Sequence, residues 1–238
     1  MTTTAPARTP ARTVLRAQGL TRVFGTGAGE VRALADASLE VAAGELLVVR
    51  GPSGSGKTTL LNLLGGLDRP TSGSVWLGDA ELTALGEKAV LAARRERIGY
   101  VFQSFGLVPV LSAAENVEVP LRLRRTPPAE RAERVAAALA AVGLTEHAKQ
   151  RPYELSGGQQ QRVGIARALV ADPEVLLADE PTGQLDSGTA AVVMDLLREV
   201  THARGVAAVV STHDPELMAR ADRVVELHDG RVVASGNG

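Results

Sequence analysis

The sequence predicts an α/β fold built on a mostly parallel sheet, with an antiparallel β layer near the N-terminus and a helical insertion. Short apolar runs at 175–178 and 206–210 have the length and composition of strands that a parallel sheet buries on both faces. Strand-like segments at 14–24 and 31–41 flank a glycine-rich turn and indicate the antiparallel layer. From about 104 to 170 the pattern becomes helical, which places the insertion between parallel strands.

Local signals bound the remaining elements. A strand at 46–49 leads through a glycine-rich loop into a helix that starts near Lys57 and ends at Gly65-Gly66. Further along we expect a strand at 74–77, a helix at about 84–93 capped by Thr83, and a strand at 98–102. A helix from Pro128 ends before Gly143 and carries Ala132, Val135, Leu139 and Val142 on one apolar face. Helices at 160–170 and about 189–200 follow, and a hairpin pairs 223–227 with 231–234.

Length and composition set the limits of the function. The 238 residues, 45% of them apolar, can bury a full core, either as one domain of two lobes or as two small domains. Basic and acidic residues number 26 and 27, so no charge excess favours nucleic-acid binding, and the absence of cysteine excludes disulfides and thiolate metal sites. Residues 1–13 offer little to bury, so we expect a disordered tail. No signal peptide or membrane-length apolar run is evident, so we expect a cytosolic protein that reaches a membrane only through a partner.

A phosphate-binding loop stands between the strand at 46–49 and the helix after it. Its residues Gly51, Pro52, Ser53, Gly54, Ser55, Gly56, Lys57 and Thr58 fit the pattern G-x-x-x-x-G-K-[ST]. The glycines let backbone N–H groups point inward, and the helix start, including Thr59, adds unpaired N–H groups and a positive dipole end. Lys57 is placed to reach the β and γ phosphates and Thr58 to ligate Mg²⁺. A glycine-rich loop that binds nothing is the alternative, but the strand before it and the helix after it favour a nucleoside triphosphate site.

Carboxylates and other polar side chains follow the predicted parallel strands. Asp179 and Glu180 end the run at 175–178, where two carboxylates are costly unless they hold a cation or take part in chemistry. Asp179 suits the Mg²⁺ partner of Thr58, and Glu180 suits a residue that orients and deprotonates a water. After the run at 206–210, His213 suits a contact to the γ-phosphate or that water. Gln103, after the strand at 98–102, either touches Mg²⁺ or the water, or is an ordinary surface glutamine.

The segment Leu155-Ser156-Gly157-Gly158-Gln159 opens another predicted helix. Ser156 and Gln159 form a capping box, which explains those two residues. It does not explain two glycines in a first helical turn, where each costs up to about 1 kcal/mol relative to alanine. Bare backbone at a positively polarised helix start suits a second phosphate contact, and we expect it to serve a second copy of the chain.

Apolar side chains at two other places leave alternatives open. Phe24 closes a strand at a turn, and it either stacks on an adenine or belongs to the core. A loop around Pro109 is crowded with apolar residues, which either fill the seam under the insertion or form a contact surface for a partner protein. These residues are Phe105, Leu107, Val108, Val110 and Leu111.

The ordered set of motifs resembles the ATP-binding subunit of an ABC transporter over about residues 15–236. The resemblance rests on the phosphate-binding loop, Gln103, the Leu-Ser-Gly-Gly-Gln signature at 155–159, Leu176-Leu177-Ala178-Asp179-Glu180, Asp186 and His213. The residues at 66–73 and 102–105 are similar to those of the branch of the family that serves lipoprotein release, macrolide and peptide export, and cell-division permeases. Gln184 departs from the asparagine common in that branch.

The resemblance implies a single ABC ATPase domain at 14–238, with a P-loop NTPase core and a helical subdomain at about 104–170. It implies ATP and Mg²⁺ as ligands and a head-to-tail homodimer that encloses two ATP molecules. Phe24 then stacks on adenine, and Asp186 communicates across the dimer. Glu180, His213, Gln103 and Lys57 are the implied catalytic residues, and Mg²⁺ is held by Thr58, Gln103 and Asp179.

The implied partners are membrane permease subunits in trans, at the inner face of the cell membrane, with no nucleic acid and no direct membrane insertion. The same ATPase also suits a mechanical switch, whose permease-like partner moves no substrate and regulates cell-wall enzymes. A soluble ATPase of DNA repair or translation is a weaker alternative. It is expected to carry a coiled coil, zinc-binding cysteines or a second ATPase domain, and the sequence has none.

Overall fold

Six strands form the central sheet of the computed structural model, which describes residues 12–237. They are β3 (Leu46–Arg50), β6 (Ile98–Val101), β7 (Val175–Asp179), β8 (Ala207–Ser211), β9 (Arg223–His228) and β10 (Arg231–Asn237), in the order β10-β9-β3-β8-β7-β6. Every neighbouring pair is parallel except β9 with β10, which form the expected hairpin. The prediction of a mostly parallel sheet is therefore confirmed.

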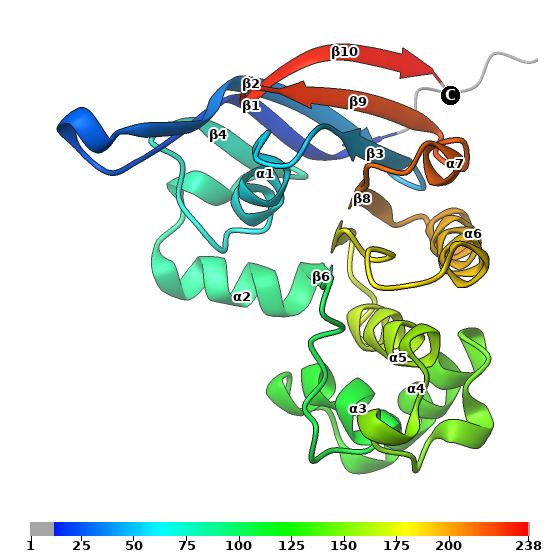
Figure 1. The fold of residues 1–238 in the computed structure, drawn as a ribbon. Coiled ribbons are helices and arrows are strands. Elements are labelled where there is room, and N and C mark those ends of the chain that lie inside the picture. The colour runs from blue at the N-terminus through cyan, green and yellow to red at the C-terminus, as the bar shows by residue number, and fades with distance from the viewer. Residues whose placement is uncertain (1–11, 238) are drawn as a thin grey trace, which may run out of the picture.

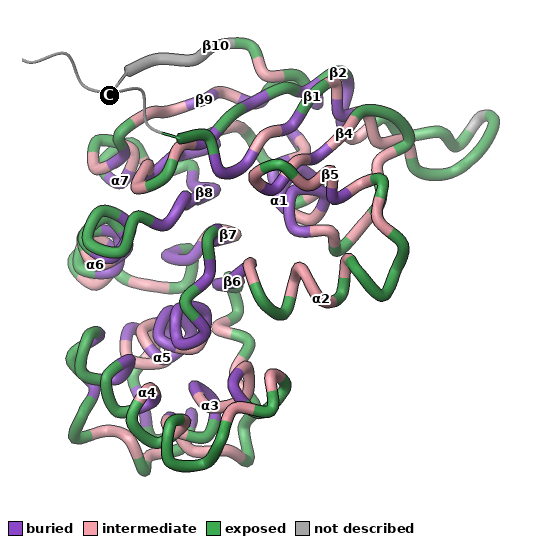
Figure 2. The backbone as a smooth tube through the Cα atoms, turned by 180° about the vertical axis from the view of Figure 1, so that it is seen from behind, coloured by how far each residue is buried: buried purple, intermediate pink, exposed green. Residues whose placement is uncertain are grey.

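The central strands are buried on both faces, as their apolar runs predict (Figure 2). On β3, Leu46 and Val48 join the core that also contains residues of α5 (Gly157–Leu169) and α6 (Ser187–Arg204). Leu47 and Val49 join the other core, with α1 (Lys57–Leu64). Because side chains alternate along a strand, α1 and α5 lie on opposite faces of the same sheet.

A four-stranded antiparallel sheet covers α1 on the side that faces away from the central sheet (Figure 1). Its strands are β1 (Thr13–Phe24), β2 (Val31–Ala42), β4 (Ser72–Leu77) and β5 (Ala80–Glu81), in the order β2-β1-β4-β5. β1 begins at Thr13, which the sequence placed in the tail, and the Ala43 amide donates to the Arg12 carbonyl at 2.9 Å. The rest of the predicted tail, residues 1–11, lies outside the described residues.

Three helices make up the insertion, which extends below the sheet in Figure 1. They are α3 (Ala113–Leu123), α4 (Pro128–Ala141) and α5, with the short 3₁₀ turns η3 (Thr145–His147) and η4 (Pro152–Glu154) between α4 and α5. The other helical elements are α2 (Glu87–Arg97), α7 (Pro215–Met218), η1 (Gly27–Gly29) and η2 (Leu82–Ala84). Within residues 12–237, no helix has the length and apolar character needed to cross a bilayer.

Two local expectations were wrong. Thr83 does not cap α2, which begins at Glu87 after Gly86, because the Thr83 hydroxyl instead accepts from the Val75 amide of β4 at 3.2 Å. Ala132 is exposed, whereas Val135, Ala138 and Leu139 are buried, because α4 makes its buried contacts with its C-terminal half.

Candidate functional site

The loop between β3 and α1 has several positions whose backbone conformation or close packing suits only glycine. Gly54 and Gly56 have φ angles of +79° and +103°, in the left-handed region that disfavours side chains. A Cβ atom on Gly56 would collide with the Ala33 carbonyl, and one on Gly51 would collide with the Leu227 carbonyl. The glycines therefore serve both the turn and its close packing against β2 and β9.

The N-terminus of α1 is equipped for an anion. Its N-cap is Gly56, which provides no side-chain cap for the first-turn N–H groups. Lys57 is buried, and its Nζ donates to the carbonyls of Gly51 at 2.8 Å and Pro52 at 3.2 Å. The buried Ser55 hydroxyl has no hydrogen-bond partner within the described part of the chain. A buried ammonium folded onto the loop and an unpaired hydroxyl beside it fit a polyphosphate, which would satisfy both.

The Glu180 carboxylate lies close to three other predicted site residues. Its Oε1 lies 3.5 Å from Lys57 Nζ and 3.8 Å from His213 Nδ1, and its Oε2 lies 3.5 Å from Gln103 Nε2. Gln103 and His213 are exposed, whereas the Glu180 side chain is 24% exposed. Side chains from the start of α1 and from the residues after β6, β7 and β8 thus meet at the C-terminal edge of the parallel sheet, where such folds bind ligands.

Ser211 supports the Asp179 carboxylate and the Glu180 backbone, and the sequence analysis assigned it no role. Its hydroxyl donates to Asp179 Oδ1 at 2.7 Å and accepts from the Glu180 amide at 2.8 Å. The backbone of Glu180 has a φ of +42°, a costly conformation for a residue with a side chain and one that clusters at functional sites. The signal for Ser211 is the register of β7 and β8, which pairs it with Asp179.

The predicted Mg²⁺ ligands have suitable chemistry. Magnesium in nucleotide sites is bound through one or two carboxylates and takes most of its other ligands from phosphate and water. Asp179 has a carboxylate held by Ser211 beside Glu180, and Thr58 is exposed in the first turn of α1. In residues 12–237 no group of three acidic or histidine side chains could hold a metal ion.

The loop after Gln103 is held by a half-buried arginine of α5, Arg167. Phe105 and Gly106 both have positive φ angles, and the Arg167 guanidinium donates to the carbonyls of both residues. Burial lowers the pKa of Arg167. Leu107 of the apolar loop packs against the core, as the first alternative expects, whereas Val110 is 73% exposed, and a partner contact there stays a prediction.

The signature turn has the predicted capping box. The Ser156 hydroxyl accepts from the Gln159 amide at 3.2 Å, and the Gln159 side chain accepts from the Ser156 amide at 2.8 Å. A Cβ atom on Gly158 would collide with the Thr189 methyl of α6, so packing accounts for this glycine. A Cβ atom on Gly157 would meet only ordinary contacts, and packing does not account for it.

Asp186 and Phe24 both have structural partners. Asp186 is the N-cap of α6 and accepts from the Thr189 amide at 3.0 Å, and its hydrogen bonds with Thr189 hold its pKa below the ordinary value. Phe24 is 41% exposed, with the Arg22 guanidinium 4.3 Å from its ring centroid. Their roles toward a nucleotide remain predictions.

Comparison with known proteins agrees on one family. The model of the family described as ABC transporter matches residues 34–183. Macrolide export ATP-binding/permease proteins MacB are 47% identical over 94% of this chain in Hyphomonas neptunium and 46% identical over 93% in Agrobacterium fabrum. The chain spans 35% and 34% of their respective lengths.

Two solved structures share the fold. Both are dimeric structures of the ATP-binding cassette MJ0796, one of them in a post-hydrolysis state with ADP and Pi. Each has a TM-score of 0.86 and 39% identity, and the matched region covers 94% of this chain and 98% of theirs.

Proposed function

The chain belongs to the ABC transporter family, and on that premise we propose that it binds and hydrolyses ATP to energise a separate membrane permease. The observation that carries the proposal is the meeting of Lys57, Gln103 and His213 around Glu180, beside an uncapped helix start. A positive helix end and a buried ammonium bind the phosphates, and a carboxylate next to them activates water.

Each side chain has a distinct task in this proposal. Lys57 leaves the loop carbonyls and binds the terminal phosphates, and Ser55 donates its free hydroxyl to the nucleotide. Glu180 accepts a proton from the attacking water, and His213 and Gln103 orient that water and the γ-phosphate. Asp179, Thr58 and Gln103 would hold Mg²⁺, which when bound would neutralise charge on the phosphates.

A second copy of the chain completes the site. Helix α5 packs on the face of the sheet opposite to α1, so the sheet separates these two helices within one chain. In a head-to-tail pair, Ser156, Gly157 and Gln159 of one copy reach the nucleotide held by the other. Asp186, at the start of α6, lies at the same interface, and Phe24 stacks on the adenine.

The permease contacts a groove next to the Gln103 loop. This groove has a volume of about 300 Å³ and is lined by α2, β6, α3 and α5. Leu91, Phe102 and Leu123 on its walls are 51%, 41% and 63% exposed, an apolar surface that favours a protein contact. Because Arg167 both lines the groove and holds Phe105 and Gly106, movement of the loop passes to the bound partner. The chain is then a cytoplasmic protein at the inner face of the cell membrane.

Phosphate release from Mg-ATP by the purified chain tests the proposed activity. We expect turnover by the wild type and none by Lys57→Ala. A chain that neither binds nor hydrolyses ATP contradicts the proposal. For the permease, Leu123→Arg is expected to prevent copurification with a membrane protein while ATP hydrolysis continues. If the Leu123→Arg variant still copurifies with the membrane protein, the groove is not the contact with the permease.

A further inference from the structure

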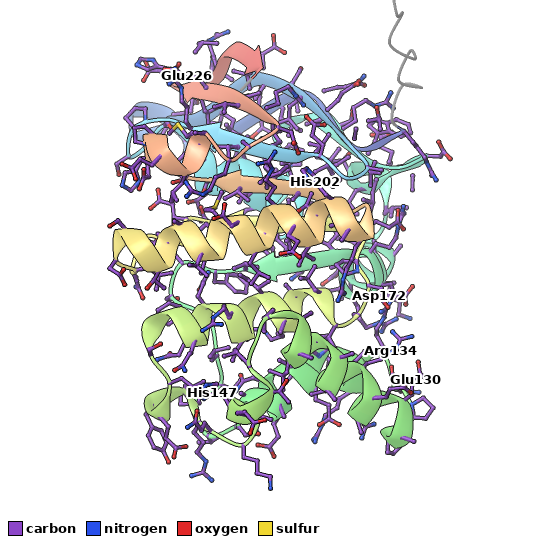
Figure 3. The ribbon with its side chains drawn as sticks, turned by 90° about the vertical axis from the view of Figure 1, so that its right-hand side faces the viewer. Glu130, Arg134, His147, Asp172, His202 and Glu226 are labelled. Carbon is purple, nitrogen blue, oxygen red and sulfur yellow. The ribbon has the colours of Figure 1, made fainter. Side chains whose placement is uncertain are left out.

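The imidazole of His147 contacts the signature glutamine. His147 ends the 3₁₀ turn η3 in the lower, helical part of the molecule (Figure 3). Its Nε2 lies 3.1 Å from the side-chain nitrogen of Gln159, and its Nδ1 lies 2.6 Å from Gln150 Oε1. The side chain is half-buried, so these two contacts hold the ring from both sides.

Hydrogen-bond accounting fixes the direction of both contacts. Gln159 Oε1 accepts from the Ser156 amide, so the NH₂ group of Gln159 is the end that faces His147. That group can only donate, so His147 Nε2 is the acceptor. Nδ1 then donates to Gln150 Oε1. The ring that satisfies this arrangement is neutral and carries its proton on Nδ1.

Protonation of the ring is incompatible with the capping box. An imidazolium has N–H groups at both positions, so Nε2–H would face the NH₂ group of Gln159, donor against donor. If the Gln159 amide turned over, its NH₂ group would face the Ser156 N–H, and the same conflict would move to the start of α5. One of the two hydrogen bonds of Gln159 must therefore break.

Charged groups near His147 do not remove this conflict. The ion pairs that histidines form in residues 12–237 involve His202, His213 and His228, so no carboxylate compensates an imidazolium at His147 in that part of the chain. Glu154 accepts from the Arg151 amide, and Arg162 donates to the Val142 carbonyl. The charged residues between positions 145 and 163 are Glu146, Lys149, Arg151, Glu154 and Arg162.

We propose that His147 is the positioning residue of Gln159: its neutral ring holds the glutamine amide in the orientation that keeps the signature turn ready for the nucleotide of a second copy. The inference deepens the proposed function and depends on it. Acid weakens the turn, because a protonated ring has no nitrogen left to accept the hydrogen bond from the Gln159 amide.

The test is the KM for ATP of the full chain at pH 8 and pH 6, in the wild type, His147→Ala and His147→Gln. His147→Ala removes the acceptor, and we expect KM at pH 8 to rise about fivefold, the factor of one hydrogen bond, with kcat little changed. His147→Gln offers an oxygen that cannot be protonated. We expect it to restore the wild-type KM at pH 8. Between pH 8 and pH 6, its KM should increase about fivefold less than the KM of the wild type.

His202→Gln is the matched control, since His202 pairs with Asp222 at the C-terminal end of α6. It should keep the wild-type pH profile. If both His147 variants match the wild type in KM at both pH values, the positioning role is wrong although the ATPase stands. A wild type without any turnover instead rejects the proposed function, and the positioning role with it.

Discussion

Helix α1 begins directly after Gly56 and helix α5 begins at Gly157, and we predicted a phosphate contact at both glycines, but the two N-termini differ. The start of α1 has no side-chain cap, and Lys57 and Ser55 beside it are buried with polar atoms to offer. At α5, Ser156 and Gln159 satisfy each other's backbone amides. The start of α1 therefore presents groups that suit an anion within a single chain. The start of α5 presents only the backbone and side-chain atoms that its capping box leaves unpaired.

The two glycines of the signature sharpen this difference. Gly158 has no side chain because α6 packs too closely, and Gly157 has none although space is available. The case for a phosphate contact at α5 therefore rests on Gly157 and the exposed Ser156, and not on a pair of glycines.

The largest expected effect separates chemistry from binding at the α1 end. Glu180→Gln keeps the shape of the side chain and removes the proton acceptor, so kcat should fall by about 10²- to 10⁴-fold while ATP still binds. Single-turnover hydrolysis and equilibrium nucleotide binding measure the two parts. Wild-type turnover in this variant means that another group activates the water.

Lys57→Ala tests whether α1 is the anion site. Loss of hydrogen bonds from a charged donor should weaken ATP binding by about 10- to 100-fold, measured by titration with a fluorescent ATP analogue. Lys88→Ala is the matched control, because Lys88 is exposed in the first turn of α2. Equal affinities in the two variants would contradict the assignment.

Gly158→Ala tests the packing explanation at α5. The added methyl meets Thr189, so the free energy of unfolding should fall by about 1–3 kcal/mol in denaturant titrations. Thr189→Ser removes the opposing methyl, and the double variant should regain most of the loss. If the double variant is no more stable than Gly158→Ala, the close approach of α6 is not the reason for this glycine.

Gly157→Ala gives the smallest effect and the sharpest distinction between the two glycines. The fold has room for the methyl group, so thermal unfolding should show no loss of stability. If the bare backbone meets phosphate, kcat/KM for ATP should fall about tenfold, the value of a hydrogen bond to a charged group. An unchanged kcat/KM removes Gly157 from the site and leaves only Ser156 and Gln159.

Short-range patterns predicted much of the fold and the site. Short continuous stretches of sequence are enough to recognise the buried strands, the phosphate-binding loop and the acids Asp179 and Glu180. The structure places Glu180 beside Lys57. The capping box of Ser156 and Gln159 is equally local.

Contacts between distant segments were not predictable in the same way. Ser211 supports Asp179 only because β7 and β8 pair in one register, and Gly158 is required only because α6 packs against α5. Thr83 matched a local capping pattern, but its hydroxyl is bound to Val75 of β4. In each case the deciding partner lies on another element, where a local pattern carries no information about it.

The molecular mass of the Glu180→Gln variant, measured by light scattering with and without saturating Mg-ATP, tests most directly that two chains share each nucleotide. The mass should double when Mg-ATP is added and should stay that of one chain when Ser156→Arg is also present. A single-chain mass for Glu180→Gln at high protein concentration and saturating nucleotide would contradict a site completed by a second copy.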